Sequence, residues 1–413
     1  MGLVAALLWV EMLNDNPNIE MKATIKTFES GAGDCEFLIL RDEQTNQSLH
    51  LMIDCNILTN EIKGYIINVL NKRIDYLIIT HVDSDHIDGF TKMLKDQDLQ
   101  DLTVNHLLFN CFQPQSENVV PIPLELKDKL EKVPFLLPQI DCEGEHKTNG
   151  ANAASFIYQL NRHPKIKKVW RKEPIVSGTI IPLGNNWGQL HFLSPTQEDL
   201  EEWFKKLKIE FASRTGRAPL TEEFENQEMY YELMSRIYEL RNKKLYNRKN
   251  AIPVISNLAY YASKEAEEEK VTVENKASLA FIWEYGNKRV LFMGDAVSST
   301  IIKNLSGKEE SLFFEAIKIA HHGSKFNTSN EFAKKIKSNH YFLTGGKKGE
   351  GPHIEAISKY IMNNTNRGIS TYLHYNHTIK GEIIEQLTQS DSISLLATYG
   401  FKLDNNNEYE FEY

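Results

Sequence analysis

The chain has few cysteines, no excess of positive charge and no long apolar run, and each shortage excludes a class of protein. Its 413 residues include four cysteines, and no two of them form a CxxC pair. That scatter argues against a disulfide scaffold and favours a reducing, cytoplasmic location. The formal net charge is −9, so nucleic acid would have to be contacted through a local basic patch.

The apolar stretch GLVAALLWVEML near the start is interrupted by Glu11 and is too short to span a membrane. It also lacks the basic region and the small-residue cleavage site of a secretory signal. We therefore expect no membrane span. The stretch is interpreted as a helix or strand extension, or as an upstream start before Met21, with a weak signal peptide as the alternative.

Strand-like and helix-like segments alternate along the first third of the chain. Helical periodicity covers 61–73 and returns after His86. Apolar or alternating segments that predict strands cover 23–30, 35–40, 48–56, 74–80 and 104–110. This alternation predicts a layered α/β fold. Strand signals resume after Ser256 with a hairpin over 278–296, in which Gly286 and Asn287 form the turn.

Residues 196–250 differ from both flanks because they are long, charged and helical in pattern. We therefore divide the chain into a first half of the α/β body, an all-helical insertion and a second half of the body, over 21–195, 196–255 and 256–413. The amphipathic stretch 221–247 of the insertion either binds a protein partner or packs on the core. The basic ends of the insertion either touch a polyanion or form a solvated face.

The stretch THVDSDHIDG, residues 80–89, crowds metal-capable side chains into one turn after an apolar strand. Its spacing is H-x-D-x-D-H, and alternate residues at a strand end project to the same side. The turn into the next helix then places Asp85 and His86 at a second position. Imidazole nitrogens and carboxylate oxygens suit Zn²⁺ and, with this many oxygens, also Mn²⁺. The candidate ligands are His81, Asp83, Asp85 and His86.

Three further groups of this kind each follow an apolar strand. Asp54 ends LMIDCN, Asp295 ends LFMGDA, and the pair His321 and His322 ends IKIAHHGS. The carboxyl ends of strands are where open α/β folds gather their sites. The sequence therefore predicts that these side chains meet the H-x-D-x-D-H loop.

Taken together, these motifs resemble the metallo-β-lactamase fold, and most closely the hydrolase domain at the end of bacterial DNA-uptake channel proteins. The pieces fall in that family's order, over roughly 23–110 and 272–360: ESGAGD, LMIDCN, THVDSDHIDG, NKASLAFIWEYGNKRVLFMGDA, IKIAHHGS and GPH. The resemblance implies an αββα four-layer sandwich, here with a helical insertion, and two divalent metal ions. Zn²⁺ is the expected ion and Mn²⁺ the alternative. The membrane channel of the uptake proteins has no counterpart in this sequence, so transport is not implied.

The resemblance also implies how the ligands are shared. His81 and Asp83 would bind one ion, Asp85 and His86 the other, and Asp295 would bridge both. One member of the pair His321 and His322 would complete the second site while its neighbour contacts substrate or supports a ligand, and the sequence leaves open which is which.

Further residues would support these ligands from behind. Asp54 and Asp34 are the candidates, with a helix N-cap as the alternative role for Asp54. Asp83 stands where the commoner pattern of the family has histidine, which hardens the site. Asn275 and Ser278 stand where the uptake branch has its N-x-x-S.

The proposed chemistry is hydrolysis by a hydroxide that the two ions share. Asp85 would hold and deprotonate that water. His353 and His322, as the histidine that does not bind metal, would protonate the leaving oxygen, although His322 is also a candidate ligand. The loop GGKKGEGPH either cradles a phosphate or is a flexible surface turn. The candidate substrate contacts are Lys347, Lys348 and Ser324.

The aspartate-rich ligand set favours a phosphodiesterase or nuclease, because charge neutralisation and positioning dominate phosphoryl transfer. The alternatives are a thioesterase or lactonase-type hydrolase of a small molecule, or a degenerate domain that serves as a scaffold. A nuclease would need local positive charge, which the run KIKKVWRK at 165–172 offers. Trp170 in that run either stacks on a base or packs in the core.

Overall fold

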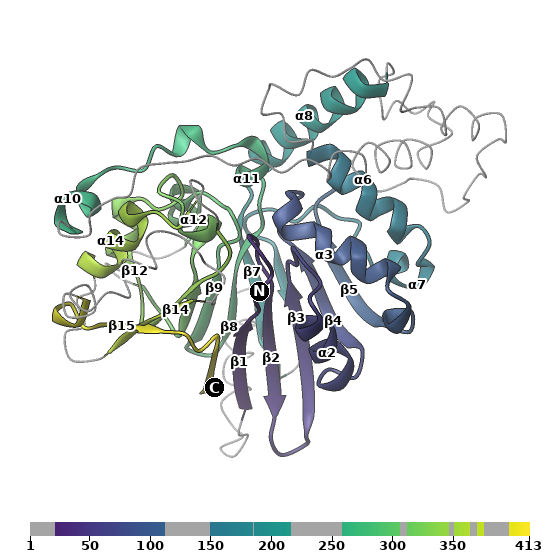
Figure 1. Cartoon of the computed structure of the whole chain (residues 1–413), viewed down its shortest axis with the longest axis horizontal. Helices are drawn as coiled ribbons and strands as arrows, with labels where there is room; N and C mark the ends of the chain where they lie inside the picture. Colours follow the sequence, from purple (N-terminus) through teal and green to yellow (C-terminus); the bar gives the residue numbers. More distant parts are fainter. Residues whose placement is uncertain are drawn as a thin grey trace, which may run out of the picture.

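The computed structural model describes residues 21–111, 149–184, 186–215, 258–305, 312–346, 351–363, 370–375 and 396–413. Two β-sheets pack face to face, and helices cover the outer face of each sheet (Figure 1). No helix among these residues is long and apolar enough to cross a membrane. The opening apolar stretch, Cys142 and the amphipathic stretch 221–247 lie outside the described residues.

The first sheet has the strand order β16-β1-β2-β3-β4-β5. Its N-terminal strands are antiparallel, β3, β4 and β5 run parallel, and the last strand of the chain returns to pair with β1. The strands are β1 (Met21–Thr27), β2 (Glu36–Asp42), β3 (Gln47–Ile53), β4 (Arg73–Ile79), β5 (Thr103–Phe109) and β16 (Glu408–Glu412). The return of β16 was not predicted, because short alternating strands carry no mark of their partner.

The second sheet has the strand order β15-β14-β13-β11-β9-β8-β7-β6. Strands β6 to β9 are antiparallel, whereas β9, β11, β13, β14 and β15 run parallel. The strands are β6 (Ile180–Pro182), β7 (Gln189–Ser194), β8 (Ala280–Tyr285), β9 (Lys288–Phe292), β11 (Ala316–Lys318), β13 (His340–Leu343), β14 (Thr371–Tyr375) and β15 (Phe401–Asp404). A separate parallel pair joins β10 (Leu312–Phe314) to β12 (Ile336–Ser338).

An apolar layer fills the space between the two sheets. It combines inward side chains of the first sheet with large aromatic side chains of the second, including Leu38, Leu51, Ile78, Phe281, Trp283 and Phe292. Each such large apolar side chain, once buried, stabilises the fold by about 1.5–3 kcal/mol. The two sheets therefore pack as one body, and this packing brings loops at the same edge of both sheets together.

Helices cover the outer faces and complete the four layers. Over the first sheet lie α2 (Asn60–Asn68), α3 (Ser84–Lys95), α6 (Asn149–Leu160), α7 (Pro164–Lys168) and α8 (Gln197–Thr215). Over the second sheet lie α10 (Leu258–Ser263), α12 (Ser298–Asn304), α13 (Asn330–Lys335) and α14 (Ile354–Asn363). Short helices η1 (Gln97–Leu99), η3 (Glu268–Lys270), α11 (Val273–Lys276) and η4 (Ala320–Gly323) join the larger elements. The α/β prediction is confirmed, and the layers follow the order αββα that the resemblance implies.

The two halves of the predicted body exchange strands. β6 and β7, which precede residue 196, lie in the second sheet, and β16 lies in the first. Of the helical insertion predicted over 196–255, the structure describes α8, and residues 216–257 lie outside the described part. Trp170 is 4% exposed, stacks on Phe109 and donates its indole N–H to the Phe109 carbonyl at 2.9 Å. It is therefore a core residue and is not free to stack on a base.

Helix α3 follows directly from its sequence and sets the orientation of the central motif. Its buried residues include Ile87, Phe90, Met93 and Leu94, which recur every three or four positions and pack on the first sheet. Asp85 lies in its first turn and lysines in its last, which suits the helix dipole. The residues just before and inside the first turn therefore face the carboxyl edge of the sheet.

Candidate metal centre

The centre lies where the carboxyl ends of strands from both sheets meet. Asp54 follows β3 and the H-x-D-x-D-H loop follows β4, whereas Asp295 follows β9 and the histidine pair follows β11. Adjacent parallel strands end at the same edge, so these loops are neighbours in space. The meeting of strand ends that the sequence predicts is present in the structure.

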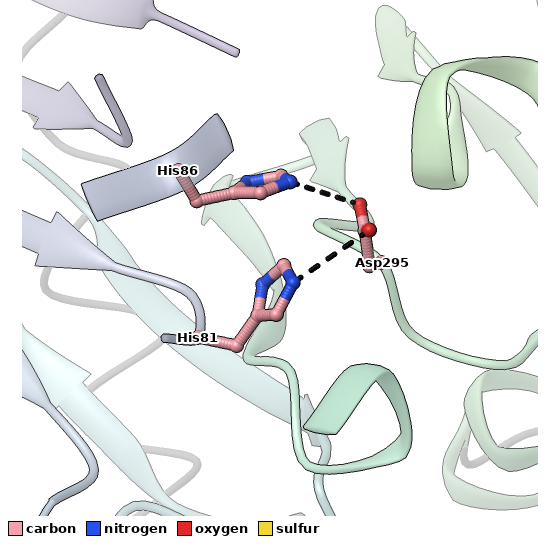
Figure 2. Close-up of side chains that lie close together, drawn as sticks. All are labelled: His81, His86 and Asp295. Atoms are coloured by element: carbon pink, nitrogen blue, oxygen red, sulfur yellow. Dashed lines mark ion pairs between the residues drawn. The ribbon is translucent and has the colours of Figure 1, made fainter. Parts of the chain in front are cut away.

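The Asp295 carboxylate faces both His81 and His86 (Figure 2). One carboxylate oxygen, Oδ1, lies 3.4 Å from His86 Nε2, and the other, Oδ2, lies 3.6 Å from His81 Nε2. His321 Nε2 also lies 3.5 Å from Oδ2. A single carboxylate thus faces both groups, which is the geometry required of a bridging ligand.

The second group consists of Asp85, His86 and His322, whose ligand atoms lie within 4.8 Å of one another. His322 Nε2 lies 3.3 Å from Asp85 Oδ2, and the His322 side chain is buried. His321 is 27% exposed and instead faces Asp295. The geometry therefore places His322 with the second group and His321 with the first, the choice that the sequence left open.

The first group adds Asp83, whose Oδ2 lies 3.8 Å from His81 Nε2. His81, His86 and Asp295 also form a compact group by themselves. His86 thus lies between both groups, whereas the resemblance assigned it to the second alone. Its Nε2 faces Asp295 and also lies within the group formed with Asp85 and His322. The ring could therefore bind an ion together with Asp85.

Four atoms of the centre that could bind a metal ion have no hydrogen-bond partner among the described residues. His81 Nε2, Asp83 Oδ1, His86 Nε2 and Asp295 Oδ1 are buried and accept or donate no hydrogen bond. Buried polar atoms in native proteins are almost always satisfied, and leaving four of them unpaired in one place would be costly. Nitrogen and carboxylate donors that converge in this way fit divalent metal ions.

Asp54 holds the His86 ring in the orientation that a metal ligand needs. Its Oδ2 accepts a hydrogen bond from His86 Nδ1 at 2.7 Å and from Thr80 Oγ1 at 2.6 Å, and its Oδ1 accepts the Thr80 N–H at 2.8 Å. Because Nδ1 carries the proton, the lone pair of Nε2 points at Asp295. The N-cap of α2 is Thr59, so the supporting role predicted for Asp54 fits its contacts and the capping role does not.

His322 is held in the same way from the other side. Its Nδ1 lies 3.0 Å from the Thr344 carbonyl and 3.1 Å from Asp34 Oδ1. Those acceptors place the proton on Nδ1 and turn Nε2 toward Asp85. Asp34 is 1% exposed and also accepts a hydrogen bond from Thr344 Oγ1 at 2.5 Å. The predicted supporting position of Asp34 therefore lies behind His322.

His81 has neutral partners in place of a carboxylate. Its Nδ1 lies 3.0 Å from Thr80 Oγ1 and 3.4 Å from Ser278 Oγ. Ser278 Oγ also accepts the Asp295 N–H at 3.0 Å, and the Asn275 amide donates to Asp295 Oδ2 at 3.1 Å. Asn275 and Ser278 therefore hold the Asp295 carboxylate in place.

The carboxylates give the centre a strongly negative electrostatic field. Burial alone lowers the pKa of His322, but Asp34 and Asp85 outweigh burial and raise that pKa to about 10. Burial likewise lowers the pKa of His86, yet Asp295 and Asp54 raise it well above its ordinary value. An environment that stabilises positive charge on imidazoles also attracts cations.

The loop that carries the histidine pair has an unusual backbone. His321, His322 and Gly323 have φ values of 47°, 52° and 76°, all in the left-handed region that ordinary side chains avoid. The conformation is held by the His321 N–H bond to the Gly294 carbonyl at 2.9 Å and by Asn327, whose side-chain amide donates to the Asp295 carbonyl at 2.8 Å. Such strain is typical of functional sites.

Of the residues predicted to contact substrate or donate a proton, one is buried, one is half-buried and two lie outside the described part of the chain. Ser324 is 1% exposed, and its Oγ accepts the Phe326 N–H at 3.3 Å. Lys347 and Lys348 lie outside the described residues. His353 is half-buried near the centre, where its Nδ1 accepts the Lys325 N–H at 3.4 Å. Burial, with Lys325 next, lowers the pKa of His353 to about 4, which favours the uncharged ring at neutral pH. The role of His353 as a proton donor stays a prediction.

Sequence reasoning missed Lys318, Asn327 and Thr344. Asn327 is fully buried and its Oδ1 pairs with His321 Nδ1 at 2.9 Å. No local pattern singles it out, because it acts only through the fold of its loop. Lys318 did leave a signal, since a lysine inside the apolar strand AIKIA has to find a partner when that strand is buried.

No family model matches the chain, and no curated protein matches it either. Among solved structures, a mutant of CmlA β-hydroxylase aligns with 97% of this chain and 55% of that chain. The identity is 9% and the TM-score 0.37. This chain therefore spans about half the length of that protein.

Proposed function

We propose that the chain is a hydrolase that uses two divalent metal ions, and that a phosphodiester is its substrate. The observation that carries the proposal is the convergence of unpaired, buried donor atoms on both sides of Asp295. A scaffold would gain nothing from such an arrangement, because each unpaired atom lowers stability unless it binds something.

The donor atoms divide between two ions. His81 and Asp83, joined by His321, would hold one ion, whereas Asp85, His86 and His322 would hold the other, with Asp295 serving both. Once bound, such ions acidify a shared water toward neutral pH and neutralise the charge that develops on the attacked group.

The chain's own groups would perform the remaining steps. Asp85 and His321 are the partly exposed members of the centre, at 24% and 27% of their side chains. The substrate would therefore approach on their side. Asp85 can take the proton of the attacking water, and His353 can hydrogen-bond an oxygen of the substrate without changing charge.

A cationic side chain beside the centre favours an anionic substrate. Lys325 lies on the loop that leaves the histidine pair, and its Nζ is 5.2 Å from the centre of the Phe326 ring. No ion pair among the described residues involves Lys325. A cation that has no acidic partner near a metal centre suits a phosphate group, and the motif resemblance to the DNA-uptake hydrolase domain points to nucleic acid.

A substrate panel tests the proposal. Protein loaded with Zn²⁺ or Mn²⁺ is assayed with bis-p-nitrophenyl phosphate, single-stranded and double-stranded oligonucleotides, a thioester and a lactone. We expect cleavage of the phosphodiesters, loss of that cleavage with EDTA, and recovery when metal returns. Cleavage of the thioester or lactone alone would replace the phosphodiester with a carbonyl substrate. Fewer than about one metal per chain, with no cleavage at all, would favour a scaffold.

A further inference from the structure

A third group of potential ligands lies next to the two already described. Asp34, Asp54 and His86 offer ligand atoms within 4.8 Å of one another. This group already has a positive charge in place, because the Lys318 ammonium forms an ion pair with Asp34 Oδ2. Lys318 is 3% exposed and comes from the last position of β11, three residues before His321.

Lys318 serves two buried carboxylates. Besides the Asp34 ion pair, its Nζ lies 3.7 Å from Glu36 Oε1. Thr344 Oγ1 links the same carboxylates, at 2.5 Å from Asp34 Oδ1 and 3.2 Å from Glu36 Oε1. Both acids are 1% exposed. Buried charge of this kind strongly destabilises a fold when its partner is removed, so Lys318 compensates a charge that the fold could not otherwise carry.

The lysine is connected to the centre through a single side chain. Asp34 contacts Lys318 through Oδ2 and His322 Nδ1 through Oδ1, at 3.1 Å for the latter. His322 in turn presents Nε2 to Asp85. The order Lys318, Asp34, His322 is thus a continuous chain of contacts that ends at a ligand atom.

We propose that Lys318 is a positioning residue of the metal centre, which holds Asp34 in place behind His322 and so tightens the binding of the ion shared by Asp85, His86 and His322. The inference rests on the metal centre and not on hydrolysis of any substrate. Groups behind metal-bound histidines typically change metal affinity by about 10–100-fold.

The test is a metal titration of the metal-free protein with Zn²⁺ against a chromophoric chelator. The wild type is expected to bind two ions. Lys318→Met fills the same space without charge, and we expect it to weaken one of the two ions by at least about tenfold. In a His81→Ala background, which disables the other group, the same substitution should weaken the one remaining ion by a similar factor.

Lys337→Met is the matched control. Lys337 is also partly buried, but within the described part of the chain its Nζ bonds to the carbonyls of Ala333 and Asn363, away from the centre. It should bind both ions as tightly as the wild type. Wild-type affinity for both ions in Lys318→Met would overturn the proposal.

A second pair of variants tests the same proposal if Lys318→Met does not fold. Asp34→Asn and the double variant Asp34→Asn with Lys318→Met leave no unpaired buried anion at Asp34. If Lys318 acts through Asp34, the two variants should bind Zn²⁺ with affinities within about twofold, because the effects are not additive. A further loss of about tenfold in the double variant would refute that route. Because these readouts are binding constants, they stand even if the substrate panel finds no cleavage.

Discussion

The two sheets contribute to the centre in different ways. The first sheet supplies one compact loop, 81–86, whose histidines are 4% exposed or less. The second supplies Asp295 from one loop and the histidine pair from another, and His321 there is 27% exposed. The carboxylate that holds His86 is within the first sheet's own loops, at Asp54, whereas His322 depends on Asp34 across the interface between the sheets. We therefore expect substitutions behind His86 to change metal binding, and substitutions on the loop after the histidine pair to change substrate binding.

The largest effect is expected where the two sheets meet. Asp295→Ala removes the carboxylate that both groups share, so both ions should be lost and turnover should fall by about 1,000-fold or more, which corresponds to about 4 kcal/mol. Elemental content and hydrolysis rate measure this, and His86→Ala should behave alike. Asp101→Ala, which breaks an exposed ion pair with Lys72, is the control. Full activity in Asp295→Ala would remove the bridging role.

A smaller effect is expected on the first sheet alone. Asp54→Asn keeps the shape of the side chain but withdraws the charge that holds His86 Nδ1. The ion near His86 should bind about 10–100-fold more weakly, while KM for substrate at saturating metal should hardly change. Zn²⁺ titration and steady-state kinetics separate the two quantities. An unchanged metal affinity would contradict the division of roles between the sheets.

The opposite outcome is expected on the second sheet's outer loop. Lys325→Met should leave metal content unchanged but raise KM by about tenfold for an oligonucleotide, since a lost charged contact costs about 1.5 kcal/mol. The small bis-p-nitrophenyl phosphate should be less affected. Lys402→Met is the control, because Lys402 also lies over an aromatic ring, 5.6 Å from Tyr372. Loss of metal in Lys325→Met would instead show that Lys325 supports the metal centre.

A last effect concerns the stability of the fold and not the metal centre, and it involves histidines of the second sheet that lie apart from the ligand loops. His340 Nδ1 and His374 Nε2 are 2.9 Å apart, and His340 stacks on Tyr409 of β16 with ring centres 3.5 Å apart. Burial, reinforced by His374, lowers the pKa of His340 from 6.5 to about 4. The folded chain therefore binds fewer protons than the unfolded chain, so this stabilisation is complete above pH 6.5 and is lost as the pH falls toward 4.

Denaturant unfolding between pH 7 and 4.5 measures that loss. The free energy of unfolding of the wild type should fall by on the order of 2 kcal/mol more than that of His340→Phe, which keeps an aromatic ring but takes no proton. The value is below the full shift because His340 is partly exposed. Identical pH profiles would show that the pair does not titrate as its surroundings imply.

Much of the centre could be predicted because its residues lie at the ends of recognisable strands. β4 reads as a continuous apolar run and is buried along almost its whole length, and the ligand loop follows at once. Local periodicity and the strand-end rule are therefore enough to place His81 and His86 near Asp295. By contrast, the protonation of His353 depends on burial by neighbours far along the chain, which no local pattern contains.

The sequence by itself determined the helices and strands, the edge of the sheets where the polar loops lie, and the identity of the candidate ligands, because these depend on residue spacing. Only the tertiary structure decided that His322 faces Asp85 while His321 faces Asp295. It also decided that Lys318 reaches Asp34, 284 positions away in the sequence. The physical reason is that side-chain direction and the burial of charge are set by packing between the two sheets, and packing partners are not neighbours in the chain.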